Sequence, residues 1–269
     1  MAEPDRATGK FVAFYELIEA CRQPGCPVCR RLTEGGRRHL DAMLYEQVTD
    51  PDTRRRLRAS WGFCNWHAWM LLEIPGAVSG AAIIYEDLTR VAIERIGRLR
   101  RAAPARAGWL ARLRRLGRPA AWSAAARRRH GRAACPVCLQ CREAEERYAA
   151  AILEFVDDRE LVRAYEVSHG LCAPHLLQVL ERGAPTPGLD ALVGRTLAKW
   201  AALRRDLGGF VAKHEYRNRQ PFTEAEAASC ARAVEMLAGG RAVWGNALHG
   251  ARDGGSGAPG EITAASGAA

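Results

Sequence analysis

Residues 26–29 read Cys-Pro-Val-Cys, and residues 135–138 repeat the same four letters. A second motif follows each copy: residues 62–67 read Gly-Phe-Cys-Asn-Trp-His, and residues 170–175 read Gly-Leu-Cys-Ala-Pro-His. The step from the last cysteine of the first motif to the cysteine of the second is 35 positions in one copy and 34 in the other. We therefore interpret the chain as two copies of one unit, offset by 108 to 109 residues.

Each unit has the pattern of a helical structure. Apolar residues recur at helical spacing after both Cys-Pro-Val-Cys motifs, with little of the alternation that is typical of strands. Proline suits the first turn of a helix, and glycine commonly follows a helix end, as Gly62 and Gly170 would here. Further helices are expected at 52–60 and 158–168, from each Cys-x-x-His motif onward, and at 81–101 and 189–214. The predicted fold class is all-α, with two tandem pseudo-repeated units, each clipped by a Cys3His metal site.

These patterns divide the chain into five parts. Thr223 and Glu226 have the capping-box spacing ahead of an amphipathic helix that is expected to end near Leu237. The predicted parts are a first metal-clipped repeat at 11–101, an arginine-rich linker at 102–134, a second metal-clipped repeat at 135–212, a helical extension at 213–249 and a disordered tail at 250–269.

The composition is that of a folded protein. Of the 269 residues, 48% are hydrophobic and 26% are charged, which provides for a sizeable core and excludes wholesale disorder. No apolar run approaches the roughly 18 residues of a membrane span. The first residues lack the basic, apolar and small-residue zones of a signal peptide, so we expect a cytoplasmic protein.

Nine cysteines in such a chain favour metal or thiol chemistry over disulfides, because the cytosol keeps thiols reduced. A tetrahedral metal site needs four donors around one point, and two motifs of the Cys-x-x-Cys type supply them. Grouping the motifs within each unit predicts two zinc sites per chain. The expected ligands are Cys26, Cys29, Cys64 and His67 in the first site, and Cys135, Cys138, Cys172 and His175 in the second.

Two other chemistries are possible for the same residues. An iron–sulfur cluster or a thiol redox centre could use Cys135, Cys138, Cys141 and Cys172, although the first unit has Leu32 where the second has Cys141. A thioredoxin-like role would require a βαβ setting, for which the chain gives no signal. Full Cys3His shells instead favour closed structural zinc sites, which leave no coordination position for a substrate.

The basic character of the chain comes from one segment. Its net charge is +10, and twelve arginines with no acidic residue lie between Arg98 and Arg132. An anionic partner, either nucleic acid or an acidic protein, could bind there, which makes nucleic-acid binding a further alternative function. An anionic membrane surface is a further possible partner, and the simplest interpretation of the segment is a solvated linker.

No motif in the sequence indicates a particular reaction. The chain has no nucleophile elbow, phosphate-binding glycine loop or zinc-protease motif. We therefore lean against an enzyme and expect a metal-binding module that binds or regulates a partner, with no catalytic residue assigned.

The paired Cys-Pro-x-Cys and Gly-x-Cys-x-x-His motifs, with the Lys-His-Glu-Tyr-Arg stretch at 213–217, resemble an uncharacterised bacterial family catalogued as a domain of unknown function. The resemblance covers about 11–240. It implies cytoplasmic bacterial proteins with duplicated Cys/His quartets and no assigned activity. This chain departs from the family pattern in its last helix, where Cys230 follows Ser229 in place of a tryptophan.

Overall fold

The computed structural model describes residues 6–102, 133–241 and 243, with side chains described from residue 12 to 98 and from 133 onward in these ranges. The described chain consists of ten helices and contains no strand, which confirms the predicted all-α class. Most of the arginine-rich segment and the expected disordered tail lie outside the described residues. None of the described helices is long and apolar enough to cross a membrane.

The first unit has one helix for each predicted segment. Helix α1 (Arg6–Cys21) precedes it, and the unit itself comprises α2 (Pro27–Glu46), α3 (Pro51–Ser60), α4 (Asn65–Leu72) and α5 (Ala77–Ala102). Asp50 caps α3 by accepting a 2.7 Å hydrogen bond from the Thr53 backbone N–H, which satisfies one of the free donors of the first turn. Gly62 follows α3 with a φ of 90°, a conformation that favours glycine.

The second unit repeats this order with α8 (Pro136–Glu154), α9 (Arg159–Val167), α10 (Ala173–Arg182) and α11 (Pro187–Lys213). Gly170 has a φ of 82°, like Gly62 at the equivalent place. The last helix, α12 (Glu224–Ala238), begins with the predicted capping box, in which the Thr223 side chain and Glu226 each bond to the other's backbone N–H.

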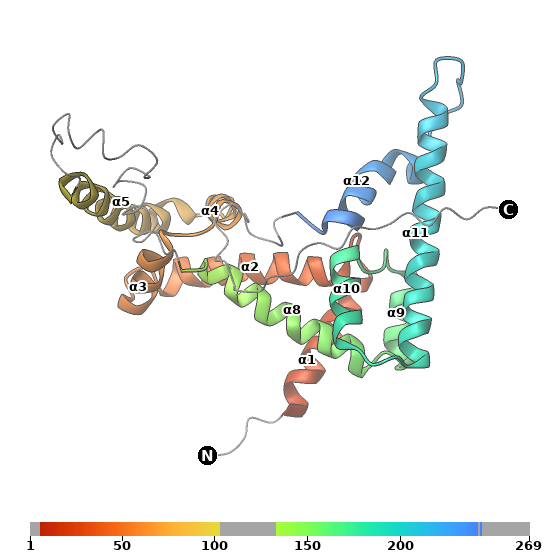
Figure 1. The fold of residues 1–269 in the computed structure, drawn as a ribbon, viewed down its shortest axis with the longest axis horizontal. Coiled ribbons are helices and arrows are strands. Elements are labelled where there is room, and N and C mark those ends of the chain that lie inside the picture. Colours follow the sequence, from red (N-terminus) through yellow and green to blue (C-terminus); the bar gives the residue numbers. More distant parts are fainter. Residues whose placement is uncertain (1–5, 103–132, 242, 244–269) are drawn as a thin grey trace, which may run out of the picture.

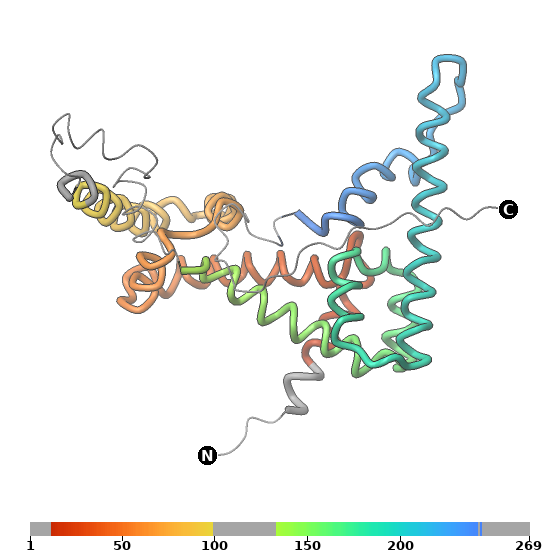
Figure 2. Tube along the Cα trace, viewed as in Figure 1, coloured from red at the N-terminus to blue at the C-terminus, as the bar shows by residue number. Residues whose placement is uncertain are grey.

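Helices α2 and α8 form the centre of the molecule and pack against each other (Figure 1). The remaining helices of the first unit gather at one end of this pair, and those of the second unit gather at the other. Figure 2 shows that the chain therefore enters α2 at the end where the second unit lies and enters α8 at the end where the first unit lies. Both motifs that start these helices are thus placed far from the rest of their own unit.

Buried side chains from both units form one continuous core. Helix α1 packs against α2, α8 and α9 and contributes the fully buried Leu17 and a 4.8 Å ring contact between Phe14 and Phe155. Because the core is shared, the repeats pack as one body. The bounds of the two repeats, 11–101 and 135–212, stay a prediction from the sequence.

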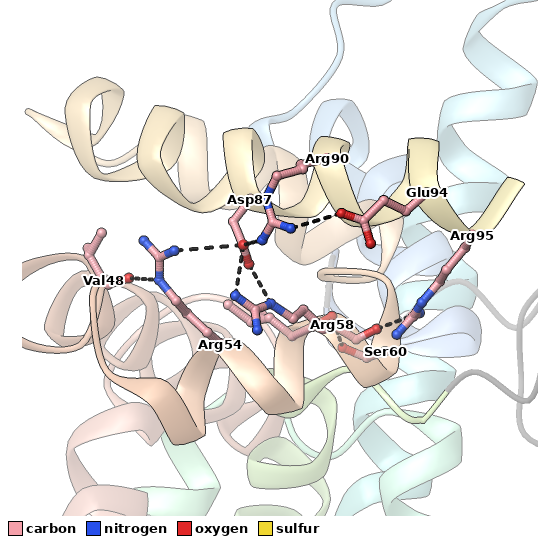
Figure 3. A network of polar contacts seen from close by, with 9 residues as sticks. Val48, Arg54, Arg58, Ser60, Asp87, Arg90, Glu94 and Arg95 are labelled. Atoms are coloured by element: carbon pink, nitrogen blue, oxygen red, sulfur yellow. Dashed lines mark hydrogen bonds and ion pairs between the residues drawn. The ribbon is translucent and has the colours of Figure 1, made fainter. Parts of the chain in front are cut away.

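A cluster of arginines around Asp87 joins α3 to α5 (Figure 3). Arg58 donates two hydrogen bonds to the carboxylate, at 2.7 and 2.8 Å, and Arg90 contacts it at 2.5 Å. The side chain of Asp87 is only 4% exposed, so its charge depends on these partners. The Arg58 hydrogen bond is the main reason that the pKa of Asp87 is lowered to about 2.

Replacing Asp87 with asparagine should lower the free energy of unfolding by about 1–3 kcal/mol, because it removes the buried partner of two arginines. Since the folded-state pKa of Asp87 is depressed, its contribution is fully present above pH 4 and is lost as the pH falls toward about 2. Denaturant titrations at pH 7 and pH 3 measure both effects. Asp52→Asn is the matched control: its 2.8 Å pair with Arg55 is exposed, so the change in unfolding free energy should stay within about 0.5 kcal/mol. Equal losses in the two variants would contradict the role of Asp87.

Candidate metal centres

The eight predicted ligands come together in two groups that could each hold a metal ion. Each group supplies three cysteine sulfurs and one histidine nitrogen, all within 4.8 Å of one another. We name the first group site A and the second site B. Site A consists of Cys26, Cys29, Cys172 and His175, and site B consists of Cys64, His67, Cys135 and Cys138.

The predicted grouping within each unit is wrong, because each site combines the Cys-Pro-Val-Cys motif of one unit with the Cys-x-x-His motif of the other. Helix lengths explain the exchange. Helix α2 has 20 residues and is about 30 Å long, whereas α3 has 10 residues and spans about half that distance. Helix α3 therefore cannot carry the following Cys64 back to the start of α2, where Cys29 lies. The start of α10 meets that end instead.

In site A, all four donors belong to the N-terminal ends of α2 and α10, where they directly precede or occupy the first turn. His175 Nδ1 lies 3.1 Å from Cys172 Sγ, 3.3 Å from Cys29 Sγ and 3.6 Å from Cys26 Sγ. The sulfurs of Cys29 and Cys172 are 3.6 Å apart. All four residues are buried.

Site B has the same construction at the N-terminal ends of α4 and α8. His67 Nδ1 lies 3.2 Å from Cys64 Sγ, 3.4 Å from Cys138 Sγ and 3.7 Å from Cys135 Sγ. The sulfurs of Cys64 and Cys138 are 3.6 Å apart. These two cysteines are half-buried, whereas the other two residues are buried.

The spacing of the donors fits a tetrahedral metal ion. Bond lengths of about 2.3 Å to sulfur and 2.0–2.1 Å to nitrogen place tetrahedral sulfurs about 3.8 Å apart, and a sulfur about 3.6 Å from the nitrogen. The measured separations, 3.6 Å between sulfurs and 3.1–3.7 Å from sulfur to nitrogen, agree with these values in both sites. The residues present therefore fit a four-coordinate metal with a complete protein shell.

The acid–base properties of the donors also suit a cation. Burial lowers the pKa of His67, but hydrogen bonds with Cys135 and the other nearby thiols outweigh it and raise that pKa to about 11. The pKa of His175 is raised to about 11 in the same way. Hydrogen bonds with Cys135 and Cys138 hold the pKa of Cys64 well below its usual value. Positive charge is thus favoured among these sulfurs, and a metal ion would take the place of the protons that they share.

A carboxylate supports the histidine of site A. Glu145 Oε1 lies 3.0 Å from His175 Nε2, the ring nitrogen that faces away from the sulfurs. Such a contact fixes the orientation of a ligating imidazole. In addition, the Gly240 backbone N–H donates a 3.1 Å hydrogen bond to Cys29 Sγ. Neither group is marked by a local sequence signal, because Glu145 lies in the middle of α8 and Gly240 lies more than 200 residues from Cys29.

Site B has different surroundings at the equivalent place. Gly36 occupies the position in the first unit that corresponds to Glu145 in the second, 109 residues later. A Cβ atom on Gly36 would lie 3.6 Å from both His67 Nε2 and Cys141 Sγ, so this glycine and the thiol stand beside the ring where site A has its carboxylate. The Cys141 thiol also donates to the Leu32 carbonyl oxygen, at 3.8 Å.

The alternative cluster of Cys135, Cys138, Cys141 and Cys172 is not assembled. Cys172 belongs to site A, whereas Cys135 and Cys138 belong to site B. One cluster cannot bind residues of both sites. The predicted iron–sulfur alternative with these four ligands is therefore wrong. Helix α8, which carries Cys138, runs on toward the second unit, and this separates the start of α8 from the start of α10.

Fold and site together define the class: an all-α, internally duplicated protein in which two Cys3His groups join the repeats. The chain belongs to the family described as "Family of unknown function (DUF6062)", whose model matches residues 15–243. This confirms the resemblance seen in the motifs. The chain is 27% identical over 230 residues to the "Uncharacterized 23.9 kDa protein in xynA 3'region" of Caldicellulosiruptor sp. (strain Rt8B.4), covering 83% of this chain and 99% of the relative. No solved structure matches the chain.

Proposed function

We propose that the protein binds two zinc ions, one in site A and one in site B, and that both are structural. The observation that carries the proposal is the donor set: three sulfurs and one imidazole nitrogen at tetrahedral spacing, twice in one chain. Thiolate and imidazole ligands in tetrahedral geometry favour zinc over calcium, magnesium or manganese, which prefer oxygen ligands. Four protein ligands leave no coordination position for a substrate, so we propose no catalytic role for either ion.

The positions of the sites indicate what the metals do. Each site joins the beginning of a central helix of one unit to the Cys-x-x-His helix of the other. Two ions would therefore link the two units at both ends of the central pair of α2 and α8. We propose a rigid binding or regulatory module whose surface meets a partner, and we place it in the bacterial cytoplasm, where reduced thiols remain available as ligands.

Elemental analysis of untagged protein purified without oxygen tests the metal assignment. We expect two zinc ions per chain and no visible absorption. Cys29→Ser should lower the content by about one ion, because it removes a ligand of site A only. Cys230→Ser is the control, since Cys230 is exposed and belongs to neither site. Protein that contains no metal, or iron with a visible band, would refute the assignment.

Binding of an anionic partner by the arginine-rich segment from 98 to 132 is an alternative that rests on the sequence alone, since most of this segment lies outside the described residues. Binding to nucleic acid should then weaken steeply as salt is raised, because counterions are released on contact with phosphates.

A further inference from the structure

We propose that the two sites differ in their reactivity: site A resists oxidation, whereas site B releases its metal when a peroxide oxidises Cys64 and Cys138 to a disulfide. The inference rests on the proposed function, since it requires a zinc ion in each site. Both sites have the same three cysteines and one histidine as ligand types. A difference in their reactivity must therefore come from the residues around them.

The first difference lies behind the histidines. Glu145 holds His175 in site A through a 3.0 Å contact to Nε2. The equivalent position beside site B is Gly36, which has no side chain, and the group beside the His67 ring is the Cys141 thiol in place of a carboxylate. Changing the group that supports a metal-bound histidine typically weakens metal binding by 10–100-fold, and site B has a thiol where site A has a carboxylate. Site B is therefore expected to hold its ion less tightly than site A.

The second difference is access to the sulfurs. The exposed fractions of the site A cysteines are between 2% and 4%, for Cys26, Cys29 and Cys172. Cys29 Sγ also accepts a hydrogen bond from the backbone N–H of Gly240, which lies just after α12. Cys64 and Cys138 are only half-buried. The susceptibility of a thiolate to an oxidant follows its exposure. A peroxide can thus reach two sulfurs of site B more readily than any sulfur of site A.

The third condition is that the oxidised sulfurs can pair. Cys64 Sγ and Cys138 Sγ are 3.6 Å apart and come from two different helices, α4 and α8. One thiolate attacks hydrogen peroxide, which forms a sulfenic acid and releases hydroxide. The second thiolate then attacks the sulfenic sulfur, so that the disulfide forms and a second hydroxide leaves. Two thiolates are oxidised, one peroxide is reduced, and the zinc ion loses two of its four ligands.

Graded oxidation of the full-length zinc-loaded protein tests the inference. Cys230→Ser protein is used, which removes an exposed thiol that could form disulfides between chains. Zinc content is measured before any oxidant is added. Hydrogen peroxide is then titrated, with released zinc followed by a colorimetric chelator and the cysteines mapped by differential alkylation and mass spectrometry.

We expect one zinc ion to be released at a peroxide concentration at least 10-fold lower than the second, with a disulfide between Cys64 and Cys138 at that point. Release of both ions together, or oxidation of Cys29 and Cys172 first, would overturn the inference while leaving the proposed function intact. A starting protein without two zinc ions would refute the proposed function itself, and the inference would fall with it.

Glu145→Gln provides a matched variant, because it keeps the shape of the side chain and removes its charge. If the carboxylate makes site A resistant, this variant should lose zinc from site A about 10-fold faster to a competing chelator, with site B unchanged. Equal rates in the variant and the parent would show that Glu145 does not distinguish the sites.

Discussion

Replacing Cys29 and Cys172 together with serine is expected to remove one zinc ion per chain, whereas replacing Cys29 and Cys64 together is expected to remove both. The reason is the exchanged pairing: Cys29 and Cys172 are ligands of the same site, and Cys29 and Cys64 belong to different sites. Pairing within the units would give the opposite result, with one ion lost in the Cys29/Cys64 variant and two in the Cys29/Cys172 variant. Metal content per folded chain therefore distinguishes the two arrangements directly.

The stability effects should follow the same pattern. Binding of a structural zinc ion contributes about 10–16 kcal/mol of apparent free energy in small zinc-binding peptides at pH 7, and much of this is folding free energy. The Cys29/Cys172 variant keeps site B and should still unfold cooperatively, at a lower temperature. The Cys29/Cys64 variant keeps neither site and should lose its cooperative transition. Because both variants carry two Cys→Ser changes, a difference between them reflects how the ligands are paired and not the number of substitutions.

Matched melting curves for the two double variants would contradict this expectation. Such a result would mean that the core alone keeps the protein folded. A Cys21/Cys230→Ser variant serves as the control for removing two thiols, since neither residue belongs to a site.

The helices could be predicted from the sequence because their signals are local. Each signal depends on residues only a few positions apart. The signals are the capping box at Thr223, the glycines after α3 and α9, and the prolines at the start of α2 and α8. The eight candidate ligands were also found from local spacing, since duplicated motifs are visible without any structure. Their role as zinc ligands stays a prediction until metal content is measured.

The pairing of the motifs could not be predicted in the same way. The spacing of 34 or 35 residues within each unit shows only that the two motifs recur together, and it does not show whether Cys29 meets Cys64 of its own unit or Cys172 of the other. The choice depends on how α2 and α8 cross, which is a property of the packed core. Glu145 was missed for a related reason: one glutamate in a helix rich in charges gains significance only when it lies 3.0 Å from His175.

A chain cut between its two units should stay together as long as it holds metal, and it should come apart when the metal is removed. A cleavage site for a specific protease, inserted between residues 103 and 132, would separate the units without touching a described helix. Each half would then carry two ligands of site A and two of site B, so neither half alone can complete a tetrahedral shell.

After cleavage, the halves should migrate as one species with two zinc ions, because the metal bonds and the shared core both hold them. A strong chelator removes the metal bonds, and what remains is the packing of α1, α2 and α3 against α8 and α9. That association depends on protein concentration, as in any two-component complex. Gel filtration over a dilution series should therefore show separated halves at low micromolar protein after chelation and an intact complex before it.

The two arrangements of ligands again give opposite results. If each unit closed its own site, the cut halves could separate on dilution while each retained one zinc ion. If the ligands are exchanged between units, separation and metal loss must occur together, because every ion is bound by residues from both halves. Measuring zinc in each gel-filtration fraction decides between them. Zinc that stays with an isolated half would refute the exchanged arrangement, and halves that stay together after complete metal removal would show that packing alone joins the units.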